Sequence, residues 1–272
     1  KLENSRFKLE SDPATPFTSY SNNMESIFSI ANSSDDNASV NGAMSSMMSA
    51  RDGGRAMCPS SPILYNSKFW RGDDKRRNLL LYRESDQYYF CDKYQNPTTR
   101  EEYAPIIRYA EVLLNYTEAV YERYAATDGS ITDESKVDAA LKYLNEVRKR
   151  VNPDMPDLTV SFAATKGLSL REEIRRERTV ELIDECFRLD DLKRWKTAEN
   201  EMPEDMLGIK YTGTAFETSG WAGVVTNTEG CLIWESGRKW DNKQYLYPFP
   251  LDQLQLNTNL RPNWQSTNPY VK

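Results

Sequence analysis

The sequence predicts a mainly helical fold of stacked helical hairpins, with long loops and a few short strands. Within residues 104–151, two stretches of apolar residues at three-and-four spacing flank a break at Asp128-Gly-Ser130. Residues 170–195 form a long charged segment that contains neither Pro nor Gly. Residues 200–244 alternate glycines with large aromatic residues, a pattern typical of loops and short strands. We treat the chain, residues 1–272, as a single domain.

Residues 1–103 are expected to form a loop-rich lead-in with short strands. Asn23–Ile30 has the apolar content of a short strand, and the apolar Leu79–Tyr82 is followed by a second strand-like segment at Tyr88–Phe90. Residues 31–62 are rich in Ser, Asn, Asp, Gly and Met, which fits a long surface loop and a ligand-contacting loop equally well.

Residues 104–199 are expected to form the helical core. Its first helix is predicted from Ala104, because apolar residues follow helical spacing from there. Its second helix is predicted to be capped by Asp133 and to end before Pro153. Together they form a helical hairpin that resembles a tetratricopeptide-type unit.

The charged segment 170–195 predicts a further helix. Ser169 and Glu172 have the spacing of a capping box, so the helix is expected to begin there, with a bend or break near Asp190. Apolar residues fall on two sides of this helix, so some of its charged residues are expected to be buried. Buried charges persist when they are paired.

Four charged residues of this helix have two interpretations. Arg178 with Glu181, and Glu185 with Arg188, lie at spacings where helical side chains meet, which indicates a structural ion network. Alternatively, Glu181 and Glu185 form a metal site or an acid–base pair. We favour the structural interpretation, because each acid has a basic neighbour.

Composition favours a binding protein over an enzyme. The chain has no histidine, which removes Ser-His-Asp and Cys-His catalysis and histidine-ligated metals. The net charge of −6 argues against a nucleic-acid partner. The four widely spaced cysteines form no zinc-ribbon pattern. We therefore expect no catalytic residues, no metal site and no cofactor, although the Asp/Asn-rich loops leave a bound calcium ion open.

Three stretches stand out by their sequence: Pro105–Ala119, the pair Arg175–Leu182 and Phe187–Trp195, and Tyr245–Leu256. Taken together and in this order, they resemble the SusD/RagB family of bacterial outer-membrane nutrient-binding lipoproteins. The resemblance runs from about residue 20 to the end of the chain and corresponds to the C-terminal half of that family.

This resemblance implies a surface-exposed outer-membrane lipoprotein that binds an oligosaccharide or polysaccharide without catalysis. It implies delivery of the glycan to a SusC-like TonB-dependent transporter, and membrane attachment only through a lipid anchor that this sequence does not contain. The resemblance also implies a structural role for Asp73, Asp74 and Arg76. Tyr65 and Trp70 lie where the family carries ligand contacts, so both are candidate glycan-binding residues.

Residues 200–272 are expected to form aromatic, Gly-rich loops followed by a tail that wraps the surface. Trp221 and Trp234 belong to these loops and are further candidates for stacking on sugar faces. The alternative, which we favour for the aromatic residues of this segment, is that they cover the helical bundle.

Two other functions compete with glycan binding. A tetratricopeptide-like helical scaffold would dock a protein partner and bind no glycan. A glycoside hydrolase would use Glu181 and Glu185 as its paired carboxylates, but the arginines around them are expected to lower both pKa values, which does not suit a general acid.

Overall fold

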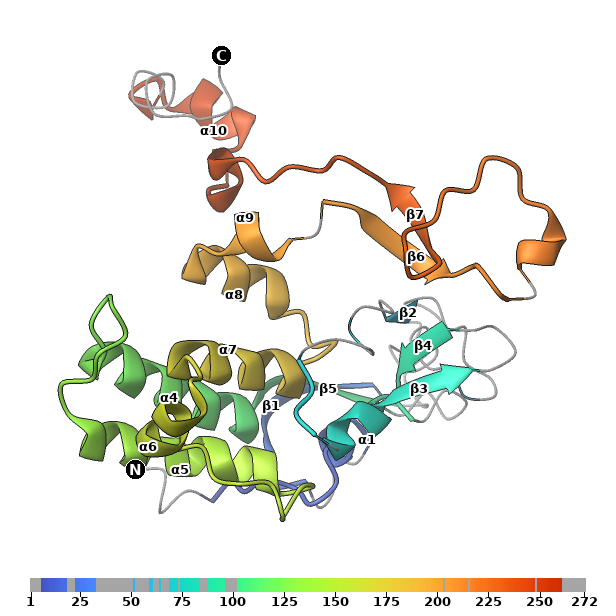
Figure 1. Ribbon diagram of the computed structural model, residues 1–272. Helices are drawn as coiled ribbons and strands as arrows, with labels where there is room; N and C mark the ends of the chain where they lie inside the picture. Colours follow the sequence, from blue (N-terminus) through green and yellow to red (C-terminus); the bar gives the residue numbers. More distant parts are fainter. Residues whose placement is uncertain are drawn as a thin grey trace.

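Helices dominate the described part of the computed structural model, and the strands are short, as predicted (Figure 1). The structure describes residues 6–18, 23–32, 51, 59–60, 64, 69–72, 74–83, 88–95, 102–202, 204–214, 216–247 and 249–260. The predicted loop at 31–62 therefore lies almost wholly outside the described residues.

The helical hairpin predicted from the apolar spacing is formed by α4 (Tyr109–Tyr124) and α5 (Glu134–Lys149). Asp133 caps α5 as predicted, because its side chain accepts a hydrogen bond from the backbone N–H of Lys136 at 3.1 Å. Helix α7 (Leu170–Glu181) packs against both α4 and α5, and the short α6 (Val160–Lys166) precedes it. The core between them is aliphatic and includes Leu113, Leu114, Val137, Leu141, Leu144 and Ile174.

The first helix begins at Tyr109, so its predicted start near Ala104 is wrong. Strand β5 (Glu102–Arg108) occupies the preceding residues and pairs antiparallel with β1 (Ser26–Asn32), the strand predicted at 23–30. Pro105 disfavours a helical conformation at the residue before it, and the two isoleucines that follow suit a strand. Sheet pairing therefore overrides the helical spacing here.

The two strand-like segments before the helices also pair. Strand β4 (Tyr88–Cys91) lies between β3 (Leu80–Arg83) and the short β2 (Pro59–Ser60), with antiparallel pairing on both sides. The 3-10 helix η2 (Lys75–Leu79) leads into β3, and α1 (Thr15–Thr18) lies against β5.

The charged helix breaks earlier than predicted. Helix α7 ends at Glu181 and α8 (Arg188–Trp195) follows, so the interruption covers residues 182–187 and does not lie near Asp190. Asp184 and Cys186 have positive φ values of 58° and 67°, which end the helical path. The backbone carbonyls freed at this break accept hydrogen bonds from the side chain of Lys93.

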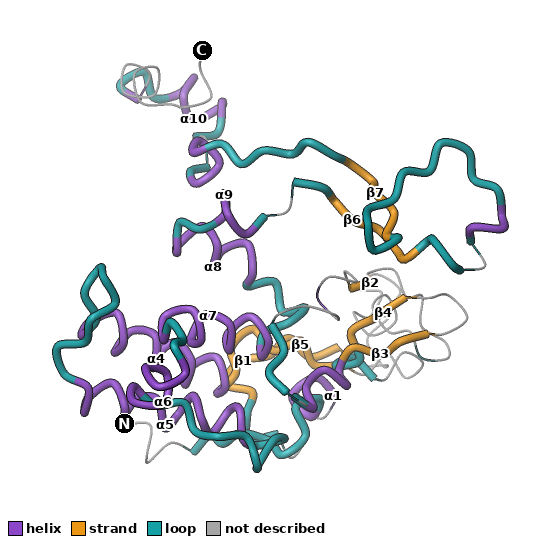
Figure 2. The backbone as a smooth tube through the Cα atoms, viewed as in Figure 1, coloured by secondary structure: helices purple, strands orange, loops and turns teal. Residues whose placement is uncertain are grey.

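The C-terminal segment is set apart from helices α4–α7 (Figures 1 and 2). It contains α9 (Ala198–Glu201), an antiparallel pair of β6 (Met206–Lys210) and β7 (Cys231–Glu235), and two 3-10 helices, η3 (Glu217–Ser219) and η4 (Asn242–Tyr245). Loops and short strands were predicted here. The tail, predicted to consist of turns, also contains a helix, α10 (Leu251–Leu256).

Candidate functional site

The most unusual feature of the described residues is a buried network of carboxylates and cations at the end of α7. Glu181 lies at its centre. Its Oε1 accepts a hydrogen bond from Arg108 Nη1 at 2.9 Å and another from Arg150 Nη2, and its Oε2 accepts one from Arg76 Nη1 at 3.2 Å. One carboxylate thus pairs with three guanidinium groups from η2, β5 and the C-terminal end of α5.

Glu185, in the break after α7, is the second buried acid. Arg108 binds it with two parallel hydrogen bonds, Nε to Oε2 at 2.6 Å and Nη2 to Oε1 at 2.7 Å. Lys93 Nζ donates to Glu185 Oε1 at 2.5 Å and to the carbonyls of Glu181 and Ile183 at 2.9 and 2.8 Å. Lys93 therefore donates two protons to the irregular backbone after α7 and the third to the Glu185 carboxylate.

Glu25, the residue that precedes β1, is the third buried acid of the network. Its Oε1 accepts from Arg108 Nη1 at 2.7 Å, and its Oε2 accepts from Arg150 Nη1 at 2.8 Å and from the backbone N–H of Glu10 at 2.9 Å. These contacts connect the start of the described chain to the helical core.

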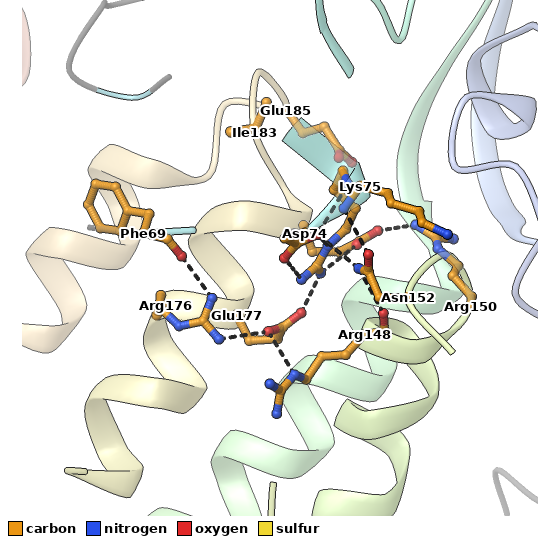
Figure 3. Close-up of polar contacts among 12 residues, drawn as sticks. Phe69, Asp74, Lys75, Arg148, Arg150, Asn152, Arg176, Glu177, Ile183 and Glu185 are labelled. Carbon is orange, nitrogen blue, oxygen red and sulfur yellow. Dashed lines mark hydrogen bonds and ion pairs between the residues drawn. The ribbon is translucent and has the colours of Figure 1, made fainter. Parts of the chain in front are cut away.

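Arg76 and Asp74 extend the network along α7 (Figure 3). Arg76 donates to Asp74 through Nε at 3.0 Å and Nη2 at 2.7 Å, and its Nη1 donates to Glu177. Asn152 Nδ2 donates to Asp74 Oδ1 at 2.9 Å. Both members of the Asp74–Arg76 pair have fully buried side chains, so their contacts are those of a structural pair; Asp73 lies outside the described residues.

The electrostatics of this network oppose acid–base catalysis. Burial alone would raise the pKa of Glu181, but Arg150, Arg108 and Arg76 outweigh burial and hold that pKa far below its usual value. Arg108 and Lys93 likewise lower the pKa of Glu185 against the effect of burial. Both acids are therefore ionised at neutral pH, whereas a general acid of a glycoside hydrolase needs a raised pKa.

The two arginines predicted in this network lie elsewhere, and the pairings expected from helical spacing do not form. Arg178 pairs with Asp191 of α8, Nε to Oδ2 at 2.6 Å. Arg188 pairs with Glu201 of α9, Nη2 to Oε2 at 3.1 Å. All four predicted residues form ion pairs, but the break after Glu181 turns Glu185 and Arg188 away from the faces that a continuous helix would give them.

The candidate glycan-binding residues of the lead-in, Tyr65 and Trp70, do not form a described binding surface. Tyr65 lies outside the described residues. Trp70 is half-buried, and its indole N–H donates to the backbone carbonyl of Leu64 at 2.8 Å. The donor that a Trp could offer to a sugar hydroxyl is therefore already used by the chain itself.

The two candidates of the C-terminal segment are exposed. The Trp234 side chain on β7 is 78% exposed, and Trp221 in the loop between β6 and β7 is 53% exposed. The rings of Tyr211 and Phe216 each lie 6.2 Å from the ring of Trp221, tilted by 32° and 39°. The interpretation that these aromatic residues cover the helical bundle is therefore wrong for Trp221 and Trp234, since their segment lies apart from it (Figure 1).

Polar groups gather at the C-terminal end of β7, one residue beyond Trp234. A cavity of about 250 Å³ next to the end of β7 is lined by Glu235, Arg238 and Gln244 together with Trp240. Arg238 Nε lies 3.9 Å from Glu235 Oε2, so guanidinium, carboxylate and amide groups share one small cavity. These are the groups that hydrogen-bond sugar hydroxyls.

Sequence reasoning missed most partners in the ion network: Glu25, Lys93, Arg108 and Arg150. They lie between 31 and 125 residues from the residues they bind, and a helical-spacing rule detects only neighbours three or four positions apart. Among the described residues, no group of three His, Cys, Asp or Glu side chains is placed to hold a metal ion. None of the described helices combines the length and apolar character that crossing a membrane requires.

Residues 72–269 match the SusD family. A search of curated proteins finds none that matches. Three solved structures share the fold, and the first is a SusD-like carbohydrate binding protein from Bacteroides fragilis, with a TM-score of 0.67 and 21% identity. The other two are surface glycan-binding proteins A from Bacteroides thetaiotaomicron (TM-score 0.60, 18% identity) and Bacteroides uniformis (TM-score 0.57, 20% identity).

The alignments cover 96%, 95% and 94% of this chain but 59%, 56% and 53% of those three chains, respectively. The chain thus spans little more than half the length of the structures that it resembles. At these identities the likeness establishes the fold.

Proposed function

The chain belongs to the SusD family, and from this premise we propose that it binds an oligosaccharide or polysaccharide nutrient at the bacterial outer-membrane surface. We propose that it passes this glycan to a SusC-like TonB-dependent transporter without changing it. The three solved structures described above are named for carbohydrate or glycan binding, which supports the ligand class.

The observation that carries this proposal is the exposure of Trp221 and Trp234. Leaving a large apolar ring in water is unfavourable, and a sugar face can cover it at little cost in side-chain entropy. The rings of Tyr211 and Phe216 lie close to the Trp221 ring, so its orientation is restrained before a ligand arrives. Arg238, Glu235 and Gln244 supply hydrogen-bonding groups in the cavity at the end of β7.

The absence of catalysis in this proposal rests on the ion network. Its two central acids have lowered pKa values and are occupied by arginine and lysine side chains. They cannot also give a proton to a glycosidic oxygen at neutral pH. The proposed site on β7 and its neighbouring loop lies apart from this network (Figure 1).

Affinity electrophoresis through gels that contain plant, host or microbial polysaccharides tests the proposal. We expect slower migration in at least one gel, lost in Trp234→Ala or Trp221→Ala and retained in Trp70→Ala. Loss in Trp70→Ala alone would instead move the site to residues 65–70. Unchanged migration of the intact chain in every gel would argue against glycan binding by this chain.

A protein-docking scaffold remains the second candidate because apolar side chains are exposed around α10. Leu246, Tyr247, Phe249, Leu251 and Leu256 are all more than half exposed. This alternative predicts that no polysaccharide gel slows the chain, and that Leu251→Glu abolishes capture of a protein partner. Retention of the wild-type chain by a polysaccharide would contradict it.

A further inference from the structure

A second cavity lies beside α7, between η2, the end of α5 and α6. Its volume is about 740 Å³, which is within the range of small-molecule sites. One wall is apolar and is formed by Met155, Pro156, Leu158, Phe162 and Leu168. The charged residues of the lining are mostly basic: Arg71, Lys75, Arg148 and Lys166 face Asp154 and Glu173.

Arg148 is the exceptional residue of this cavity. Its side chain is only 5% exposed, yet its guanidinium donates no hydrogen bond to any described residue. Its one ionic contact is Nε to Glu177 Oε2 at 3.5 Å, and Nε and Nη1 are both buried without a hydrogen-bond partner. In Figure 3, no dashed line reaches the terminal nitrogens of Arg148, which point away from Asp74 and Asn152.

Glu177 cannot satisfy Arg148, because other arginines already use both of its oxygens. Arg76 Nη1 donates to Oε1, and Arg176 Nη2 donates to Oε2 at 3.2 Å. One carboxylate therefore faces three guanidinium groups. Buried charges are normally paired and hydrogen-bonded, and here the guanidinium groups outnumber the carboxylate oxygens available to them.

The electrostatic surroundings of Arg148 are short of negative charge. Burial lowers the pKa of Arg148, Glu177 raises it, and the nearby Arg176 and Arg76 lower it further. Every other guanidinium that contacts Glu177 has additional partners: Arg76 binds Asp74, and Arg176 binds Glu173 and the Phe69 carbonyl. Arg148 is thus the group with spare donors.

We propose that this cavity binds a small amphipathic carboxylate, with its carboxylate paired to Arg148 and its apolar body against Leu158 and Phe162. A carboxylate pairs with a guanidinium through a charge-assisted hydrogen bond, and Nη2 is the Arg148 nitrogen that is not among the fully buried unpaired atoms. A single negative charge suffices, because one guanidinium is unsatisfied. The apolar wall disfavours a bare inorganic anion or a polyhydroxylated sugar.

This site differs from the proposed glycan site in place and in chemistry. It lies at the helical core, whereas Trp221 and Trp234 belong to the segment set apart from α4–α7 (Figure 1). Polysaccharide retention is therefore expected to be unchanged when Arg148 is replaced. The two proposals can fail independently.

Calorimetric titration of the whole chain with 4-phenylbutanoate tests the site, with 4-phenylbutanamide as the uncharged match. We expect saturable binding of the carboxylate, at least tenfold weaker binding of the amide, and at least tenfold weaker carboxylate binding in Arg148→Met. The matched control is Lys149→Met: this neighbouring cation pairs with Asp157 in an exposed position, and its loss is expected to leave binding unchanged.

The thermal midpoint of Arg148→Met separates a ligand-binding role from a structural one. Glu177 keeps Arg76 and Arg176 in this variant, so we expect an unchanged or higher midpoint. Phe162→Ala is a second variant that keeps the charges and is expected to weaken carboxylate binding several-fold. No saturable binding, equal binding of acid and amide, or wild-type affinity in Arg148→Met would overturn the proposal.

Discussion

Replacing Glu181 by Gln is the most informative perturbation of this fold, because one buried carboxylate accepts hydrogen bonds from three arginines. Gln keeps the size of the side chain and removes its charge. The amide NH2 group would then face at least one guanidinium, since Arg76 approaches one oxygen while Arg108 and Arg150 approach the other. The substitution thus removes attraction and adds a clash between donors.

The expected loss in the free energy of unfolding is about 3 to 5 kcal/mol, the cost of breaking a buried ion pair by removal of one partner. Glu25 and Glu185 remain as partners of Arg108, and Asp74 and Glu177 remain as partners of Arg76, which favours the lower end of this range. Against a total stability of about 5 to 15 kcal/mol, this loss is large.

Urea denaturation followed by circular dichroism measures the loss, and Glu122→Gln is the matched control. Glu122 pairs with Arg171, Nε to Oε1 at 2.9 Å, but both side chains are partly exposed. Such a pair contributes about 0 to 1 kcal/mol. A loss in Glu181→Gln no larger than that of the control would refute the conclusion that the network stabilises the fold.

Three further outcomes are expected. The folded-state pKa values of Glu181 and Glu185 lie below the unfolded value of about 4.3, so their stabilisation is complete above that pH and is lost progressively as pH falls toward the folded-state values. Urea midpoints should therefore start to drop at about pH 5 and keep falling at lower pH, and they should drop less in Glu181→Gln. Peptide mapping after iodoacetamide treatment of the folded chain should find Cys186 alkylated and Cys91 protected, because Cys186 is exposed whereas burial, followed by Asp184, raises the pKa of Cys91. Leu141→Ala should lower the free energy of unfolding by about 2 to 5 kcal/mol in urea titration, because Leu141 is fully buried between the helices.

Local sequence signals predicted the helical part of the fold well. The second helix begins at the predicted cap, Asp133, because a helix start is decided by a few neighbouring residues. The start of the first helix was misplaced, because residues 102–108 pair with β1, which lies 70 to 82 positions earlier. The break after Glu181 was also misplaced, since Lys93 binds the carbonyls there from 88 and 90 positions away.

The site was harder to predict than the fold. The charge density of residues 170–195 indicated that the acids there are paired. A pairing rule based on helical spacing, however, cannot identify partners on other elements. Glu181 binds Arg108, which lies 73 positions away, and Arg76, which lies 105 positions away. The exposure of Trp221 and Trp234 was the less favoured of two interpretations for a related reason: it depends on how β6 and β7 sit relative to the helices, and no local pattern encodes that placement.

The central claim is that this chain binds a glycan through exposed indoles and leaves it intact. Its most direct test is calorimetric titration with an oligosaccharide prepared from whichever polysaccharide slows the chain, followed by mass spectrometry of the recovered sugar. We expect saturable binding, about tenfold weaker in Trp234→Ala or Trp221→Ala, or roughly 1.4 kcal/mol, and recovery of the sugar at its original mass. Unchanged affinity in both variants, or recovery of shortened products, would contradict the account.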